Sequence, residues 1–256
     1  MTDASLVLAG IPGFATALVR ARLSNGPSNA SYLIEQGDAA FVLRVDKPEA
    51  TRLGLDREAE GEVLRALAGA GLVEAPLYSA PSQGILLRRF IPGRTWSPDE
   101  WRESGKLARL AHVLRKLHAL SPAGRPFDPL GAARRYAMQL GTPRAQAVLE
   151  AAAKAYAAIP PATPVLCHND PVCGNILESG DRLILIDWEY AGGGDPFFDL
   201  AVVVEHHAVD EQHARGFVAA YLGREPGDDD LGRLDRHCRF YGRLLELWRL
   251  RVGETA

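Results

Sequence analysis

The chain has 256 residues, of which 47% are hydrophobic and 24% are charged, a composition typical of a globular protein with a sizeable core. The net charge of −3 and pI of about 6.2 argue against nucleic acid as the main partner, because phosphate binding needs a basic surface. No apolar stretch reaches about 18 residues, and the N-terminus carries an acid where a secretion signal has bases. We therefore expect a cytoplasmic protein with no membrane partner.

The first 91 residues predict a small antiparallel sheet with one helix. Residues 18–45 have the pattern strand, turn, strand, strand, with the polar turn "SNGPSN" after the first strand and a Gly-Asp turn after the second. Residues 55–70 have apolar side chains at helical spacing and acids near the start, which favours an amphipathic helix. Residues 84–91 predict a further strand, which the following proline ends.

The remaining residues predict a mainly helical segment interrupted by two short strands. A Ser, a Pro and acids open the first helix at residue 97, as is usual at a helix start. The strands are expected at 175–178 and 183–187, and the helices at 97–120, 143–159, 197–222 and 229–251. The expected fold class is α+β.

Three polar residues frame the two short strands. Pairing the strands around the Ser-Gly-Asp turn between them predicts Ile176 opposite Ile186 and Asn175 opposite Asp187. An amide and a carboxylate that converge in this way are suitable ligands for Mg²⁺. Asp170 precedes them in a loop, where its carboxylate could orient a hydroxyl and accept its proton. The alternative is that all three residues only cap turns.

The segment "HNDPVCGNIL" followed by "LILIDWEYAGGGDPFFDLA" resembles the aminoglycoside phosphotransferase/choline kinase superfamily, most closely bacterial choline/ethanolamine or thiamine kinases. The resemblance implies a protein-kinase-like bilobal fold with a nucleotide-binding lobe at 1–91 and a catalytic, substrate-binding lobe at 92–256. It assigns Asp170 as the catalytic base and Asn175 and Asp187 as magnesium ligands.

The first lobe also resembles this family. "LSNGPSNASYLIE" is similar to its phosphate-cradling loop, although the single Gly departs from the protein-kinase glycine pattern. "FVLRV" resembles the strand that carries a phosphate-binding cation, here Arg44, with Glu60 as its expected partner and Glu58 as the alternative. The implied nucleotide contacts are Ser24, Asn25, Gly26, Ser28, Asn29, Arg44 and Glu60, with hinge backbone at Arg89, Phe90 and Ile91 facing adenine.

The implied function is an ATP- and Mg²⁺-dependent phosphotransferase that acts on the hydroxyl of a small cationic alcohol such as choline, ethanolamine or thiamine. Two alternatives remain open: an aminoglycoside O-phosphotransferase, and a kinase-like module that binds nucleotide without turnover. The motif G-x-x-x-x-G-K-[ST] of P-loop enzymes and the motif G-x-S-x-G of α/β-hydrolases are both missing.

Several residues near the motif have two interpretations. We expect His168 to brace the loop, and Asp199 to cap the following helix and brace the loop. Trp188 and Tyr190 could equally line a pocket or fill the core, whereas the helical spacing of Trp248 favours the core over a cation–π wall. Negative charge beside such a wall could come from Glu189, Glu205 and Glu246.

Overall fold

The computed structural model describes residues 4–253, and its contacts divide the chain into two compact units, Met1–Pro92 and Gly93–Ala256. The division falls one residue after the boundary expected from the sequence. No helix within residues 4–253 is long and apolar enough to cross a membrane.

The first unit contains a five-stranded antiparallel sheet with the strand order β1-β2-β3-β5-β4. The predicted strands over residues 18–45 and 84–91 are present, and the three-residue β4 was not predicted. The strands are β1 (Leu18–Asn25), β2 (Asn29–Gln36), β3 (Ala39–Asp46), β4 (Tyr78–Ala80) and β5 (Ile85–Arg89).

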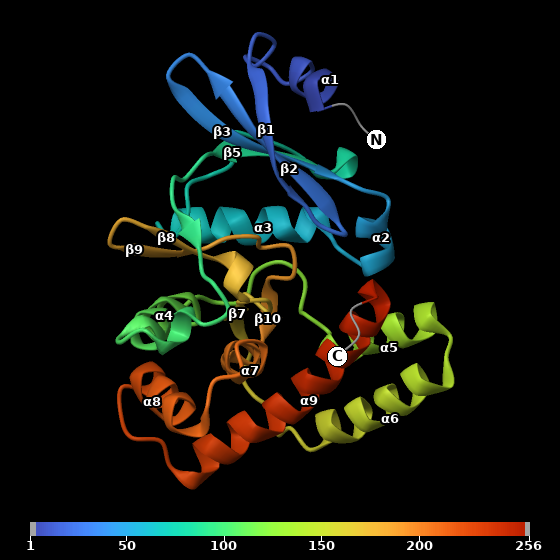
Figure 1. Cartoon of the computed structure of the whole chain (residues 1–256), viewed down its shortest axis with the longest axis vertical. Helices are drawn as coiled ribbons and strands as arrows, with labels where there is room; N and C mark the ends of the chain where they lie inside the picture. Colours follow the sequence, from blue (N-terminus) through green and yellow to red (C-terminus); the bar gives the residue numbers. More distant parts are fainter. Residues whose placement is uncertain (1–3, 254–256) are drawn as a thin grey trace. The chain divides into compact units, whose positions relative to one another are not determined.

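Side-chain alternation along β3 gives this sheet two different faces. Phe41, Leu43 and Val45 point into an apolar cluster that includes Leu8 of α1 (Ala4–Ala9). The intervening Arg44 points to the other face, which α3 (Arg57–Gly69) covers (Figure 1). A cation on β3 and an acid on α3 can therefore meet inside this unit.

The expectation of a single helix in this unit was wrong. Besides α3, which Asp56 caps, the described part of the unit contains α1, α2 (Glu49–Leu53) and the 3-10 helix η1 (Pro81–Gln83). Each of these has six residues or fewer, too short to show an apolar period in the sequence.

The second unit is mainly helical, and the 25-residue α9 packs against α5, α6 and α7 (Figure 1). The predicted helix at 97–120 is a 3-10 turn followed by α4, and the predicted helix at 197–222 is two helices separated near Ala208, whose φ is +50°. Helix α5 was not predicted. The helices are η2 (Glu100–Arg102), α4 (Lys106–Leu117), α5 (Pro129–Leu140), α6 (Pro143–Ala157), η3 (Cys173–Asn175), α7 (Pro196–His206), α8 (Glu211–Leu222) and α9 (Asp228–Val252).

Short strands form two small sheets in this unit. One has the order β6-β8-β9 and the other pairs β7 with β10. Their bounds are β6 (Arg94–Thr95), β7 (Val165–Cys167), β8 (Ile176–Ser179), β9 (Arg182–Leu185) and β10 (Gly192–Gly194).

The predicted register of the β8–β9 hairpin was wrong by one residue. Ile176 pairs with Leu185, not with Ile186, and the N–H of Ile186 donates to the carbonyl of Asn175 at 2.9 Å. The connecting turn contains only two residues, and Gly180 supplies the positive φ of 60° that such a turn needs. Asp187 consequently lies beyond the ladder.

Candidate active site

A buried ion pair joins the sheet and α3 of the first unit. Both terminal nitrogens of Arg44 donate to Glu60, to Oε1 and Oε2, at 2.6 Å each. Burial acts to raise the pKa of Glu60, but Arg44 and Arg57 outweigh it and hold the pKa below its ordinary value. The structure therefore selects Glu60 over the exposed Glu58 as the partner of Arg44.

Two residues of this cluster were not predicted. Arg57 donates to Glu60 at 2.9 Å and to both carboxylate oxygens of Asp46 at 2.7 and 2.8 Å. Their positions offered a signal, since Asp46 closes the strand that carries Arg44 and Arg57 lies in the first turn of the helix that carries Glu60.

The predicted nucleotide loop is shorter than the sequence suggested. Ser24 and Asn25 lie in β1 and Asn29 begins β2, so only residues 26–28 connect the strands. Lys47 ties this connection down: its Nζ donates to the carbonyl of Gly26 at 2.5 Å and its backbone N–H to the carbonyl of Ser28 at 2.8 Å.

The predicted hinge follows directly from β5. Arg89 is the last residue of β5, and the N–H of Phe90 donates to the carbonyl of Ala40 at 3.0 Å. The sheet already uses this donor, so a contact between Phe90 and an adenine would have to use the carbonyl of Phe90. The backbone contacts of Arg89, Phe90 and Ile91 with adenine stay a prediction.

In the second unit, His168 braces the loop that carries Asp170, as predicted. Its ring is fully buried; Nε2 contacts the carbonyl of Ile186 at 3.0 Å, and Nδ1 accepts from the N–H of Asp170 at 3.3 Å. Burial lowers the pKa of His168, so the imidazole is neutral with its proton on Nε2. The ring therefore orients the loop through both of its nitrogens.

Asp199 holds the same loop from α7. Its fully buried carboxylate accepts from the backbone N–H of His168 at 2.8 Å, from that of Asn169 at 2.6 Å and from Nε2 of His118 at 2.9 Å. The expectation that Asp199 also caps α7 was wrong, because Asp195 is the capping residue. Asp199 lies in the first turn, where its side chain reaches the loop instead.

Asp170, Asn175 and Asp187 lie in the second unit as an interacting group. Nδ2 of Asn175 donates to the carboxylate and to the carbonyl of Asp170, both at 2.9 Å. Burial raises the pKa of Asp170 well above its ordinary value, and the charges of Asp187 and Glu189 raise it further. Asp187 and Asn169 have φ of 63° and 65°, a strained conformation common at functional sites.

This group suits a divalent cation. With Nδ2 of Asn175 turned toward Asp170, its Oδ1 is the amide atom left for a metal. Oxygen donors from an amide and carboxylates are the ligands that Mg²⁺ takes, and a cation here would offset the repulsion between Asp170 and Asp187. Asn175 and Asp187 could therefore hold the metal.

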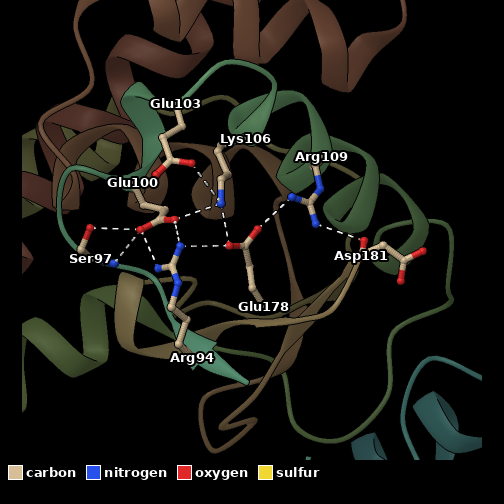
Figure 2. Close-up of polar contacts among 8 residues, drawn as sticks. All are labelled: Arg94, Ser97, Glu100, Glu103, Lys106, Arg109, Glu178 and Asp181. Carbon is tan, nitrogen blue, oxygen red and sulfur yellow. Dashed lines mark hydrogen bonds and ion pairs between the residues drawn. The ribbon is translucent and has the colours of Figure 1, made fainter. Parts of the chain in front are cut away.

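A network of charged side chains anchors the β8–β9 hairpin to α4 and β6 (Figure 2). Glu178 of β8 accepts from Nζ of Lys106 at 2.6 Å and from Arg109 at 2.8 Å. Lys106 also donates to Glu100 at 2.9 Å, and Glu100 accepts from Arg94 of β6. Asn175 precedes this hairpin and Asp187 follows it, so the network fixes the segment that carries both candidate ligands.

An aromatic cavity of about 180 Å³ lies beside Asp170. Three tyrosines and a tryptophan, Tyr136, Tyr190, Tyr241 and Trp248, contribute to its wall together with Asp170. The preference for Trp248 as a core residue was wrong, because its side chain lines this cavity. Trp188 fills the core instead: it is buried and packs on His168 with ring centroids 4.6 Å apart. Glu189, Glu205 and Glu246, which were expected to supply negative charge beside such a wall, are not among the described residues that line the cavity.

Most of this wall was not predicted, although part of it had a signal. Tyr241, Leu244, Leu245 and Trp248 recur at helical spacing on one face of α9. Tyr136 comes from α5, more than 100 residues earlier in the chain, and nothing in its local sequence indicated that it would join them.

Comparisons with known proteins identify similar sequences and folds. A family model described as the phosphotransferase enzyme family matches residues 20–236. Protein LicA of Haemophilus influenzae is 30% identical over 211 residues, 78% of this chain and 61% of that protein. Thiamine kinase of Escherichia coli (strain K12 / DH10B) is 31% identical over 213 residues, 78% of this chain and 70% of that protein. The chain thus spans about three fifths of that LicA protein's length.

Solved structures support the same fold. A choline/ethanolamine kinase family protein from Mesorhizobium loti superposes with a TM-score of 0.77 at 27% identity, covering 96% of this chain and 84% of that one. Choline kinase LicA from Streptococcus pneumoniae superposes with a TM-score of 0.74 at 20% identity, covering 93% and 85%. The predicted kinase-like α+β fold is confirmed.

Proposed function

Because this chain belongs to the phosphotransferase enzyme family, we propose that it transfers a phosphoryl group from ATP, with Mg²⁺, to the hydroxyl of a small cationic alcohol of the choline, ethanolamine or thiamine type. The observation that carries this proposal is the aromatic cavity with Asp170 in its wall.

The cavity has the chemistry of a cation site. The faces of Tyr and Trp rings attract alkylammonium groups, and the attraction is strongest where water is excluded. Burial raises the pKa of Tyr136, Tyr190 and Tyr241, so these phenols stay neutral at physiological pH. Asp170 in the same wall places an acidic group beside such a cation, and the cation would favour the ionised form of that group.

Within this proposal, Asp170 orients the acceptor hydroxyl and accepts its proton as the phosphoryl group is transferred. His168 and Asp199 hold the loop so that the carboxylate needs no rearrangement before reaction. Mg²⁺, held by Asn175 and Asp187, would neutralise charge on the phosphates of the nucleotide.

We assign the first unit to the nucleotide. Its resemblance to the family's nucleotide lobe supports this assignment, as does the cation that Glu60 holds in one orientation on β3. The guanidinium of Arg44 would contact phosphate oxygens, for which its planar fork is suited. Residues 24–29 and the backbone at Arg89 and Ile91 would contact the phosphates and the adenine.

The two alternatives have less support. An aminoglycoside is a multi-ring polycation, whereas a cavity of about 180 Å³ lies below the usual range of about 300–1,000 Å³ for drug-sized ligands. A module without turnover would not need Asp170, Asn175 and Asp187 together, and this chain retains all three.

The test is a screen with ATP and Mg²⁺ against choline, ethanolamine, thiamine and kanamycin, with mass-spectrometric detection of phosphorylated product. We expect product from at least one of the three small cationic alcohols and none from kanamycin. Phosphorylation of kanamycin alone would support the aminoglycoside alternative, and nucleotide binding without any product would support the module. Asp170→Ala should abolish turnover of the best acceptor, and retention of full activity would overturn the assigned base.

A further inference from the structure

A second cavity, of about 400 Å³, adjoins the aromatic cavity in the second unit. Phe127 and Asn169 line both cavities. The rest of its wall is largely apolar and includes Tyr156, Phe198 and a proline-rich segment at 159–164. We call it the proline-lined cavity.

Phe127 stands where the two cavities adjoin. Its ring lies 6.2 Å from that of Tyr190, which lines the aromatic cavity, and 5.7 Å from that of Phe198, which lines the proline-lined cavity. A single side chain thus contacts an aromatic residue of each cavity.

The glycines of β10 hold Phe127 in this position. The N–H of Phe127 donates to the carbonyl of Gly193 at 3.0 Å. A Cβ on Gly192 would lie 2.1 Å from the carbonyl oxygen of Arg125, and a Cβ on Gly193 would lie 3.2 Å from Cβ of Pro122. Glycine at both positions therefore permits the segment 122–127 to lie directly on β10.

The chain is also fixed on the other side of Phe127. Asp128, the next residue, caps α5 by accepting from the N–H of Gly131 at 2.8 Å. Phe127 therefore lies between a hydrogen bond to β10 and a helix N-terminus, and its backbone has little freedom to move the ring aside.

The charged groups of the proline-lined cavity already have partners. Asp195 accepts from Arg233 at 2.6 Å and contacts Nε2 of His237 at 3.1 Å. These partners help to lower the pKa of Asp195 to about 2 against the opposing effect of burial, so the carboxylate is ionised and compensated. The cavity thus suits an apolar or aromatic group better than a second cation.

We propose that Phe127 is a specificity-determining residue that separates the aromatic cavity from the proline-lined cavity and so limits the acceptor to small alcohols. Removal of its ring joins the cavities and admits amino alcohols with a bulky aromatic N-substituent. This inference rests on the proposed function, because the aromatic cavity must be the acceptor site.

The experiment compares choline with its N-benzyl analogue, benzyl(2-hydroxyethyl)dimethylammonium, as acceptors for the wild type and for Phe127→Ala. We expect the ratio of kcat/KM for the benzyl compound to that for choline to rise about tenfold or more in the variant, the scale of pocket contacts in substrate discrimination. The control is Phe14→Ala, which removes a ring packed at 5.0 Å on Phe41 in the first unit and should leave the ratio unchanged. An unchanged ratio in Phe127→Ala would overturn the proposal.

A second variant locates the benzyl group. In the background of Phe127→Ala, the change Tyr156→Trp reduces the space of the proline-lined cavity only, so it should reverse the gain for the benzyl compound and spare choline. A gain that survives Tyr156→Trp would show that the benzyl group lies elsewhere and would refute the subsite.

Two further measurements separate failure of this inference from failure of the proposed function. Phe127→Leu keeps an apolar side chain and serves as the substitute if Phe127→Ala does not fold. A rise in the ratio for Phe127→Leu, smaller than that expected for alanine, supports the proposal, and no rise overturns it. If the wild type phosphorylates no alcohol, the proposed function fails. In that case calorimetry still tests whether Phe127 separates the two cavities. Tighter binding of the benzyl compound to Phe127→Ala than to the wild type supports the separation, and equal binding overturns it.

Discussion

Asp199 gives the sharpest test of how the catalytic loop is held. The change Asp199→Asn keeps the size of the side chain but replaces one of two acceptor oxygens with an NH₂ donor. The carboxylate now accepts from three donors: the N–H of His168, the N–H of Asn169 and Nε2 of His118. In either orientation of the amide, at least one buried N–H loses its acceptor and faces another donor.

The size of the effect follows from these contacts. A hydrogen bond to a charged group contributes about 1.5–3 kcal/mol, and one or two such bonds are lost, so we expect the free energy of unfolding to fall by about 1.5–6 kcal/mol. We also expect kcat to fall about 100-fold, because the backbone that positions Asp170 loses its anchor.

Urea denaturation followed by tryptophan fluorescence is a suitable assay. All four tryptophans, Trp96, Trp101, Trp188 and Trp248, lie in the second unit, so the signal reports on the unit that contains Asp199. The matched control is Asp210→Asn at the exposed start of α8, where Asn caps a helix as well as Asp does and the midpoint should not change. If Asp199→Asn shows the control's midpoint and an intact kcat, the bracing role is wrong.

Three further changes test other parts of the molecule. Glu178→Ala should lower the free energy of unfolding by about 2 kcal/mol in urea denaturation, because it leaves Lys106 without one of its carboxylates; an unchanged midpoint would contradict an anchoring role for the network. Glu60→Gln should raise the KM for ATP about tenfold, equal to about 1.4 kcal/mol, because Arg44 loses its charged partner. The KM for the acceptor should not change. Equal effects on the KM values of both substrates would argue against a nucleotide role for Arg44. Burial and the neighbouring imidazole lower the pKa of His207 from 6.5 to about 4, so the stability due to its neutral form is present above pH 6.5 and falls by about 3 kcal/mol as the pH drops to about 4. In the variant His207→Phe, the urea midpoint should change less with pH over this range than it does in the wild type. An equal pH dependence in the two proteins would refute the burial argument.

The family and the fold could be predicted because their signal is local. The residues from His168 to Asp187 lie in one short segment, and the family model confirms the resemblance that this segment carried. The partner of Arg44 needed the structure, because Glu58 and Glu60 both follow the strand at helical positions and only the fold shows which one is buried.

The cavity wall could not be predicted for the opposite reason. Tyr136, Tyr190, Tyr241 and Trp248 come from segments that are distant in the sequence, and they meet only after α5 and α9 pack together. Helical spacing placed Trp248 on an apolar face, but an apolar face can meet a cavity as readily as a core. The predicted register of the hairpin was wrong by one residue at the turn. A shift of one position changes every pair in a ladder.

Of the described residues other than glycine, three have a positive φ: Asn169, Asp187 and Ala208. Asn169 directly precedes the proposed base and Asp187 is itself a proposed metal ligand, so their strain accompanies function, whereas Ala208 lies between α7 and α8. An L-residue with a side chain costs roughly 1–2 kcal/mol in the left-handed conformation, and Gly does not. The change Ala208→Gly should therefore raise the melting temperature and leave turnover unchanged. That result would separate backbone strain that serves the reaction from strain that does not.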